Sequence, residues 1–119
     1  MAGSLCVLVD RPPYGSIQPA EAIRHAMGAM GKGWEVVLAL TGDGVYTAIK
    51  SQSPPEGEWI DLSESLSDFV KEGKGTLLVE SAALEARGIP VGDLISEASP
   101  AAMSEIAGAL ARCDRALIF

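Results

Sequence analysis

The sequence has no apolar run long enough to cross a membrane and no basic segment ahead of its first apolar run. That run, residues 5–9, is too short for the hydrophobic region of a signal peptide and ends at Asp10. A membrane-spanning helix needs about 20 consecutive apolar residues, and no stretch approaches that length. We therefore expect a cytoplasmic protein with reduced thiols and no membrane contact.

Basic and aromatic residues are both scarce. The chain has 9 Lys and Arg against 16 Asp and Glu, for a net charge of −7, and aromatic residues make up 5%. Nucleic acids and anionic membranes require a basic patch, and single strands also stack on aromatic side chains. The composition therefore excludes nucleic acid as a direct partner and suits a basic protein partner.

Cysteine is limited to Cys6 and Cys113, which lie at opposite ends of the chain. Neither a CxxC motif nor a zinc-ligand spacing is possible, so we expect no metal and no cofactor. Cys6 lies in an apolar run and is predicted to be a buried, inert core thiol. Cys113 lies at the end of a predicted helix beside Asp114, where the thiolate form is disfavoured. Cys113 is therefore a weak candidate for a nucleophile. No catalytic residue is assigned from the sequence.

The chain of 119 residues, 48% of them apolar, is expected to form one domain over residues 1–119. Apolar runs alternate with segments of helical periodicity, which predicts an α/β fold: a three-layer α/β/α arrangement with a mainly parallel sheet of about five strands. The expected strands are residues 5–9, 36–40, 76–79 and 116–119, with a connector at 89–95 that is open to a short edge strand. Helices are expected from Pro19 onward, through 45–49 after a turn at 41–44, from a start within 61–64, at 81–87 and after Ser99.

The last of these helices is predicted from a Ser-Pro pair, with Ser99 as the N-cap and Pro100 as the first helical residue. Helical spacing then gives the faces expected to be buried. They are Ala22, Ile23, Ala26, Met27 and Met30; Leu62, Leu66, Phe69 and Val70; and Met103, Ile106, Ala107 and Leu110.

Ligands of such sheets bind outside the carboxyl ends of the strands. Three unusual segments follow strands here, at residues 10–15, 41–44 and 80–81, and should converge on one edge. The candidate cleft or interface residues are Tyr14, Gly15, Asp43, Gly44, Glu80 and Ser81.

Several of these candidates, and His25 outside this set, have both a functional and a purely structural reading. Asp43-Gly44 is either a ligand loop or a turn, and it matches neither a dinucleotide nor a phosphate-loop motif. Glu80 could bind a cation or act as a base, or it could only stabilise a helix start. His25, the single histidine, is either a catalytic base or a surface residue. Tyr14 suits an interface or a cleft.

Four segments, in order, resemble the DsrE/DsrF superfamily, and especially TusC/DsrF-type and TusD/DsrE-type sulfur-relay subunits. They are residues 9–15, the Thr-Gly-Asp-Gly-Val-Tyr stretch at 41–46, residues 79–88 and residues 113–119. The match spans nearly the whole chain. It implies a DsrE-like fold, assembly as a homo-oligomer or as a hetero-oligomer with DsrE/TusD-like paralogues, and a place in sulfane-sulfur transfer.

One position departs from that resemblance. Where active subunits of the family carry the persulfide cysteine, this chain has Glu80. A carboxylate cannot hold sulfur as a persulfide. The resemblance therefore implies a partner or scaffold subunit that lacks the transfer cysteine, and it favours a non-catalytic partner of a sulfurtransferase.

Two other functions stay open, because a fold does not determine a function. The chain could be a small ligand-binding protein or enzyme with Glu80, Asp43 and Tyr14 around a cleft, or a homo-oligomeric binding module with no sulfur role. An oligomer is expected in any case, because Tyr14, Met27, Met30 and Trp59 offer apolar surface beyond the needs of the core.

Overall fold

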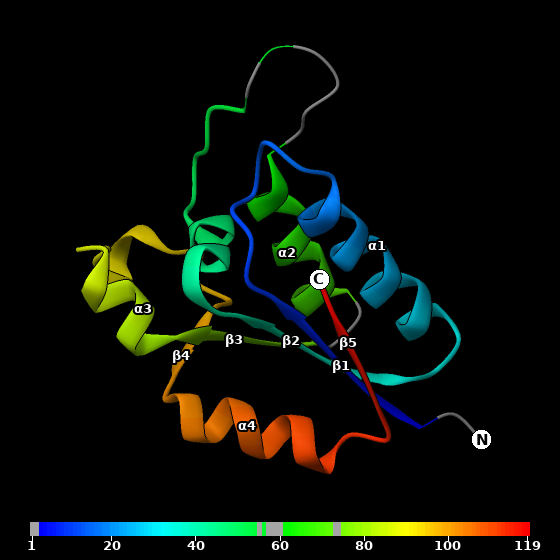
Figure 1. The fold of residues 1–119 in the computed structure, drawn as a ribbon. Coiled ribbons are helices and arrows are strands. Elements are labelled where there is room, and N and C mark those ends of the chain that lie inside the picture. The colour runs from blue at the N-terminus through cyan, green and yellow to red at the C-terminus, as the bar shows by residue number, and fades with distance from the viewer. Residues whose placement is uncertain (1–2, 55, 57–60, 73–74) are drawn as a thin grey trace.

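The computed structural model describes residues 3–54, 56, 61–72 and 75–119, which form a sheet with helices on both sides (Figure 1). Within these residues the sheet has five strands in the order β4-β3-β2-β1-β5, and each neighbouring pair is parallel. The strands are β1 (Ser4–Val9), β2 (Glu35–Leu40), β3 (Thr76–Glu80), β4 (Ser99–Ala101) and β5 (Arg115–Ile118). The predicted α/β fold is confirmed.

The strand order explains why the sheet is covered from both sides. The chain adds β2, β3 and β4 in one direction from β1 and then returns to place β5 on the other side of β1. Right-handed crossovers that run in opposite directions put their helices on opposite faces. The helices α1 and α2 thus cover one face and α4 the other (Figure 1). The helical segments are α1 (Gln18–Gly31), η1 (Gly42–Ala48), α2 (Leu62–Lys71), α3 (Ser81–Ala86), η2 (Val91–Asp93) and α4 (Met103–Arg112).

The main core lies between the sheet and the helices α1 and α2. Side chains alternate between faces along a strand, so Leu5, Val7 and Val9 point into this core while Cys6 faces α4. Phe69 and Leu66 of α2 are fully buried against these strands. The core under α4 is much smaller and is formed by Ala39, Ala101 and Ile106, with Leu8, Leu78 and Leu110 partly buried around it.

The predicted start of the last helix is wrong. Residues 99–101 form β4, which pairs with residues 78–80 of β3, and α4 begins at Met103. Pro100 is paired with Val79 at the edge of the sheet, where its missing N–H removes no hydrogen bond to an outer strand. A Ser-Pro pair can begin either a helix or an edge strand. Here residues 99–101 form a strand because β3 has an edge with unpaired backbone groups.

Two further expectations at this end of the chain need correction. Residues 89–95 contain the short helix η2 and one antiparallel bridge between Ile49 and Leu94, and the edge strand comes later. In α4, Ile106 and Ala109 are buried, whereas Met103 and Ala107 are exposed. A sheet face with so narrow a core accommodates only part of the predicted apolar stripe.

Other local predictions agree with the structure. Pro19 lies in the first turn of α1, which ends at Gly31. The helix expected to begin within residues 61–64 is α2. Its N-cap, which the sequence left open, is Asp61, whose carboxylate accepts the Ser63 N–H. The short helix after β2 is a 3-10 helix. Trp59 lies outside the described residues, and within them no helix is both long and apolar enough to cross a membrane.

Candidate functional site

The carboxyl ends of three strands meet at one edge of the sheet. The N–H of Thr41, at the end of β2, donates to the Val9 carbonyl at the end of β1, at 2.9 Å. The next residue, Gly42, donates its N–H to Glu80 Oε1 at the end of β3, at 3.1 Å. The structure therefore brings together the predicted candidates Asp43, Gly44 and Glu80.

Glu80 is the last residue of β3 and the N-cap residue of α3, and it is half-buried. Its extended backbone directs the carboxylate across to the β2 loop, where it accepts the Gly42 N–H instead of capping its own helix. A bond of this kind, from an N–H to an ionised acceptor, is stronger than a neutral one. The site thus holds a carboxylate that can accept hydrogen bonds or a proton, and that offers no sulfur nucleophile.

Gly44 explains how the loop comes so close to β1. A Cβ at this position would lie 2.9 Å from the Val9 carbonyl carbon and closer still to its oxygen, whereas real Cβ atoms essentially never approach other atoms within 3.0 Å. Gly44 is buried in η1, and its N–H donates to the Thr41 carbonyl at 2.8 Å. Only glycine allows this approach, so Gly44 has a structural role whatever else the site does.

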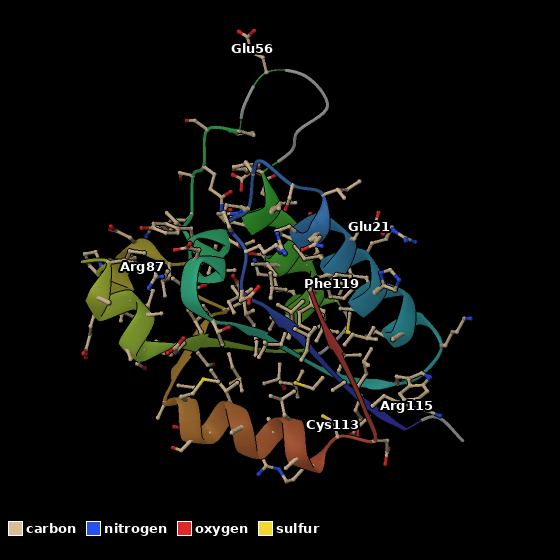
Figure 2. The ribbon with its side chains drawn as sticks, viewed as in Figure 1. Glu21, Glu56, Arg87, Cys113, Arg115 and Phe119 are labelled. Carbon is tan, nitrogen blue, oxygen red and sulfur yellow. The ribbon has the colours of Figure 1, made fainter. Side chains whose placement is uncertain are left out.

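Arg87 connects the β2 loop to α3 (Figure 2). Its Nη2 donates to Asp43 Oδ1 at 2.9 Å and its Nε to the same oxygen at 3.1 Å, while its Nη1 donates to the Ala83 carbonyl. The Arg87 side chain is 25% exposed and that of Asp43 is 56% exposed, so the pair borders solvent. Sequence analysis gave Arg87 no role, although it lies in the stretch that carries the family resemblance.

Tyr14 and Gly15 belong to the loop after β1. Tyr14 is half-buried against the main core, its hydroxyl donates to Gln52 Oε1 at 2.5 Å, and burial raises the pKa of Tyr14. The Gln52 amide in turn donates to the carbonyls of Thr47 and Ile49. Tyr14 thus ties its loop to the end of η1, and an additional interface role stays a prediction, as it does for exposed Gly15 and half-buried Ser81.

The two cysteines, remote in sequence, are neighbours in the fold. Cys6 is fully buried in β1, as predicted, while Cys113 is partly exposed where α4 ends (Figure 2). Burial raises the pKa of Cys6 to about 11, and the adjacent Cys113 thiol adds to that rise. The sequence predicts two separate thiols, and no local pattern indicates that they are neighbours. The one signal that could have indicated it is the parallel pairing of the first strand with the last.

His25 lies away from the strand ends, on the exposed side of α1. Its Nδ1 is 2.8 Å from the Glu21 carbonyl, and its ring centroid is 5.5 Å from that of Phe119. It borders an open cavity of about 370 Å³ with Arg24, Lys32 and Trp34, which is lined by none of the candidates at the strand ends. This position favours the surface reading of His25. The described part of the chain contains no cluster of three or more potential metal ligands.

Comparison with known proteins yields consistent matches. The model of the DsrE/DsrF-like family matches residues 3–119. The chain is 31% identical to the uncharacterized protein MJ0989 of Methanocaldococcus jannaschii, over 95% of this chain and 96% of that one. It is 28% identical to the uncharacterized protein MK0008 of Methanopyrus kandleri, over 97% and 93%.

Solved structures share the fold. The ychN protein from E. coli superimposes with a TM-score of 0.85 at 22% identity, covering 100% of both chains. MTH1491 from Methanobacterium thermoautotrophicum, a protein of unknown function, gives 0.71 at 14% identity, covering 89% of each. At these identities the superpositions demonstrate a common fold and nothing finer.

Proposed function

This chain belongs to the DsrE/DsrF-like family, and we propose that it acts as a partner or scaffold subunit in a sulfur-relay or intracellular sulfur-metabolism complex. In this proposal the chain itself transfers no sulfur. A cysteine-bearing paralogue of the DsrE/TusD type carries the persulfide, and this subunit completes or positions the assembly.

The observation that supports this role is the state of Glu80. The residue stands where the resemblance expects the transfer cysteine, and its carboxylate accepts the Gly42 N–H at 3.1 Å. In a cysteine-bearing relative, the same N–H would be available to an anionic sulfur, because backbone N–H groups stabilise anions. Here a carboxylate already uses that donor, and a carboxylate oxygen cannot accept a sulfane sulfur as a thiolate does when it becomes a persulfide.

A second observation supports a protein partner. β5 lies at one edge of the sheet and all four of its residues are exposed, including Leu117 at 38% and Ile118 at 71%. Apolar side chains exposed on an edge strand are typical of surfaces that associate, so we propose a homo-oligomer or a hetero-oligomer with a paralogue.

Sulfur labelling tests the proposal. The chain carrying Cys113→Ala, in which the remaining thiol is buried, is incubated with a cysteine desulfurase and its substrate, and added sulfur is measured by intact-protein mass spectrometry. We expect no stable gain of a sulfur atom. Introducing Glu80→Cys into the same background should allow uptake of one sulfur per chain, because the Gly42 N–H is then free to stabilise the thiolate and persulfide.

Ser81→Cys in the same background is the matched control. Residue 81 is adjacent and half-buried like Glu80, but it lies one residue into α3, beyond the strand end that Gly42 contacts. We expect clearly slower labelling at position 81 than at position 80. Equal labelling at both positions would mean that residue 80 has no special chemical support, and persulfidation of the parent Cys113→Ala chain would show that the chain is itself a carrier.

A further inference from the structure

The two cysteines are brought together by the pairing of the first and last strands. Cys6 is paired with Ala116 in the register of β1 with β5, and Cys113 lies only three residues before Ala116. Next to it, Asp114 is held against β1, because its carboxylate accepts the Ser4 N–H at 2.9 Å and its own N–H donates to Ser4 Oγ at 3.1 Å. These two hydrogen bonds hold the turn after α4 beside the start of β1.

A cavity at this turn gives independent evidence of proximity. Cys113 lines an open cavity of about 290 Å³ together with Ser4, Val37 and Arg112. Val37 is the register partner of Cys6 in β2, and Ser4 precedes Cys6 by two residues, so both share the α4 face of the sheet with Cys6. Cys113 therefore lies over the side chains that flank Cys6, and its thiol is close enough to raise the pKa of Cys6.

The two thiols differ in access to solvent. Cys6 is 0% exposed, whereas Cys113 is partly exposed and borders the cavity. A small reagent in solution can therefore reach Cys113 first, and Cys6 can react only with a sulfur that is already beside it. This is the division between an entry thiol and a resolving thiol in two-cysteine redox pairs.

We propose that Cys6 and Cys113 form a reversible dithiol–disulfide site that reacts with low-molecular-weight disulfides. Cys113 loses its proton and attacks, as the thiolate, one sulfur of the reagent RSSR. The S–S bond of the reagent breaks, a mixed disulfide forms on Cys113, and the released RS⁻ takes up a proton. Cys6 then gives up its proton to the second leaving RS⁻ as its sulfur attacks Cys113 Sγ. The sum is two protein thiols plus RSSR giving one intramolecular disulfide plus two RSH. The two thiols are oxidised and the reagent is reduced.

The disulfide would act on a poorly buried part of the fold. It would join β1 to the turn between α4 and β5, closing a loop that includes nearly the whole chain. Every residue of β5 is exposed, and the core under α4 is small. The oxidised protein should therefore hold α4 and β5 more firmly, with an apparent melting temperature higher than that of the reduced form by more than about 5 °C.

The test uses the full chain in its folded state. The reduced protein is incubated with oxidised glutathione, and acid stops the exchange. The protein is then unfolded near neutral pH with excess maleimide to alkylate the remaining free thiols, and the products are mapped by mass spectrometry. We expect single chains whose mass is lower by two hydrogens and in which neither cysteine is alkylated. After trypsin digestion, the peptide that contains Cys6 should be linked to the peptide Cys113-Asp114-Arg115. A glutathione adduct that persists on Cys113 while Cys6 stays free would overturn the proposal, as would a disulfide that joins two chains.

Single variants separate the two roles. Cys113→Ala removes a partly exposed side chain and should leave Cys6 unreacted over the time in which the wild type is fully oxidised. Cys6→Ala should instead accumulate the glutathione adduct on Cys113. Rapid oxidation of Cys6 in Cys113→Ala would show that Cys113 is not the entry thiol. If Cys6→Ala folds poorly, the peptide map of the wild type still tests the disulfide by itself. That map also does not depend on the sulfur labelling at position 80, so the two proposals can fail separately.

Discussion

The close approach of Gly44 to β1 can be tested with a single methyl group. Gly44→Ala would place a Cβ 2.9 Å from the Val9 carbonyl carbon and nearer still to its oxygen, while η1 stays buried on its other sides. The backbone of Gly44 lies outside the left-handed region, so the cost is steric and not conformational. Either η1 or the end of β1 has to move by several tenths of an ångström.

The magnitude follows from what that movement disrupts. Overpacking a close-packed site costs about 1–3 kcal/mol. The displaced segment also carries the hydrogen bonds from Thr41 to Val9 and from Gly44 to Thr41, each contributing about 1 kcal/mol. We therefore expect Gly44→Ala to lower the free energy of unfolding by about 2–4 kcal/mol, measured by urea unfolding followed by far-UV circular dichroism.

Gly28→Ala is the matched control. Gly28 lies in α1, and a Cβ there would meet no heavy atom within 4 Å apart from its chain neighbours and the backbone of its own helix. The same chemical change should therefore stabilise the protein by about 0.5–1 kcal/mol through helix propensity. If the free energy of unfolding of Gly44→Ala differs from that of the wild type by less than about 0.5 kcal/mol, the close contact between Gly44 and Val9 does not limit the residue at position 44.

Three further predictions concern the core, the pH dependence and association. Cys6→Ser should lower the free energy of unfolding by about 1–3 kcal/mol in urea titrations, because a buried hydroxyl needs a hydrogen-bond partner; unchanged stability would contradict the observed burial. Because the pKa of Cys6 rises from 9.0 in the unfolded chain to about 11 in the folded one, the thiol stabilises the fold below pH 9, and this contribution is lost as the pH rises from 9 to 11. The free energy of unfolding should fall by up to about 2 kcal/mol over this pH range, and this fall should be absent in Cys6→Ala. The same pH dependence of the free energy of unfolding in both proteins would argue against this contribution. The wild type should sediment as an oligomer at micromolar concentration, and Ile118→Lys should shift it toward the monomer with little change in stability, since Ile118 is 71% exposed. A wild type that is monomeric throughout would rule out self-association.

The sequence alone determines most of the secondary structure and the fold class. Continuous apolar runs such as residues 36–40 identify strands that are buried on both faces, and the proline and glycine at the ends of α1 mark its limits. These features are local, since each depends on side-chain periodicity and on backbone preferences within a few residues. The family resemblance is likewise spread along the chain in order, and it correctly indicated the DsrE-like fold.

The tertiary structure decides what depends on pairing between distant segments. Ser99 and Pro100 have the local signature of a helix start, but the open edge of β3 recruits them as β4. The carboxylate of Glu80 finds its partner, the Gly42 N–H, only because β2 and β3 are adjacent. Likewise, only the return of the chain to β1 puts the thiol of Cys113 beside Cys6. Strand order is set by burial of the whole sheet, a collective free energy that no short stretch of sequence contains.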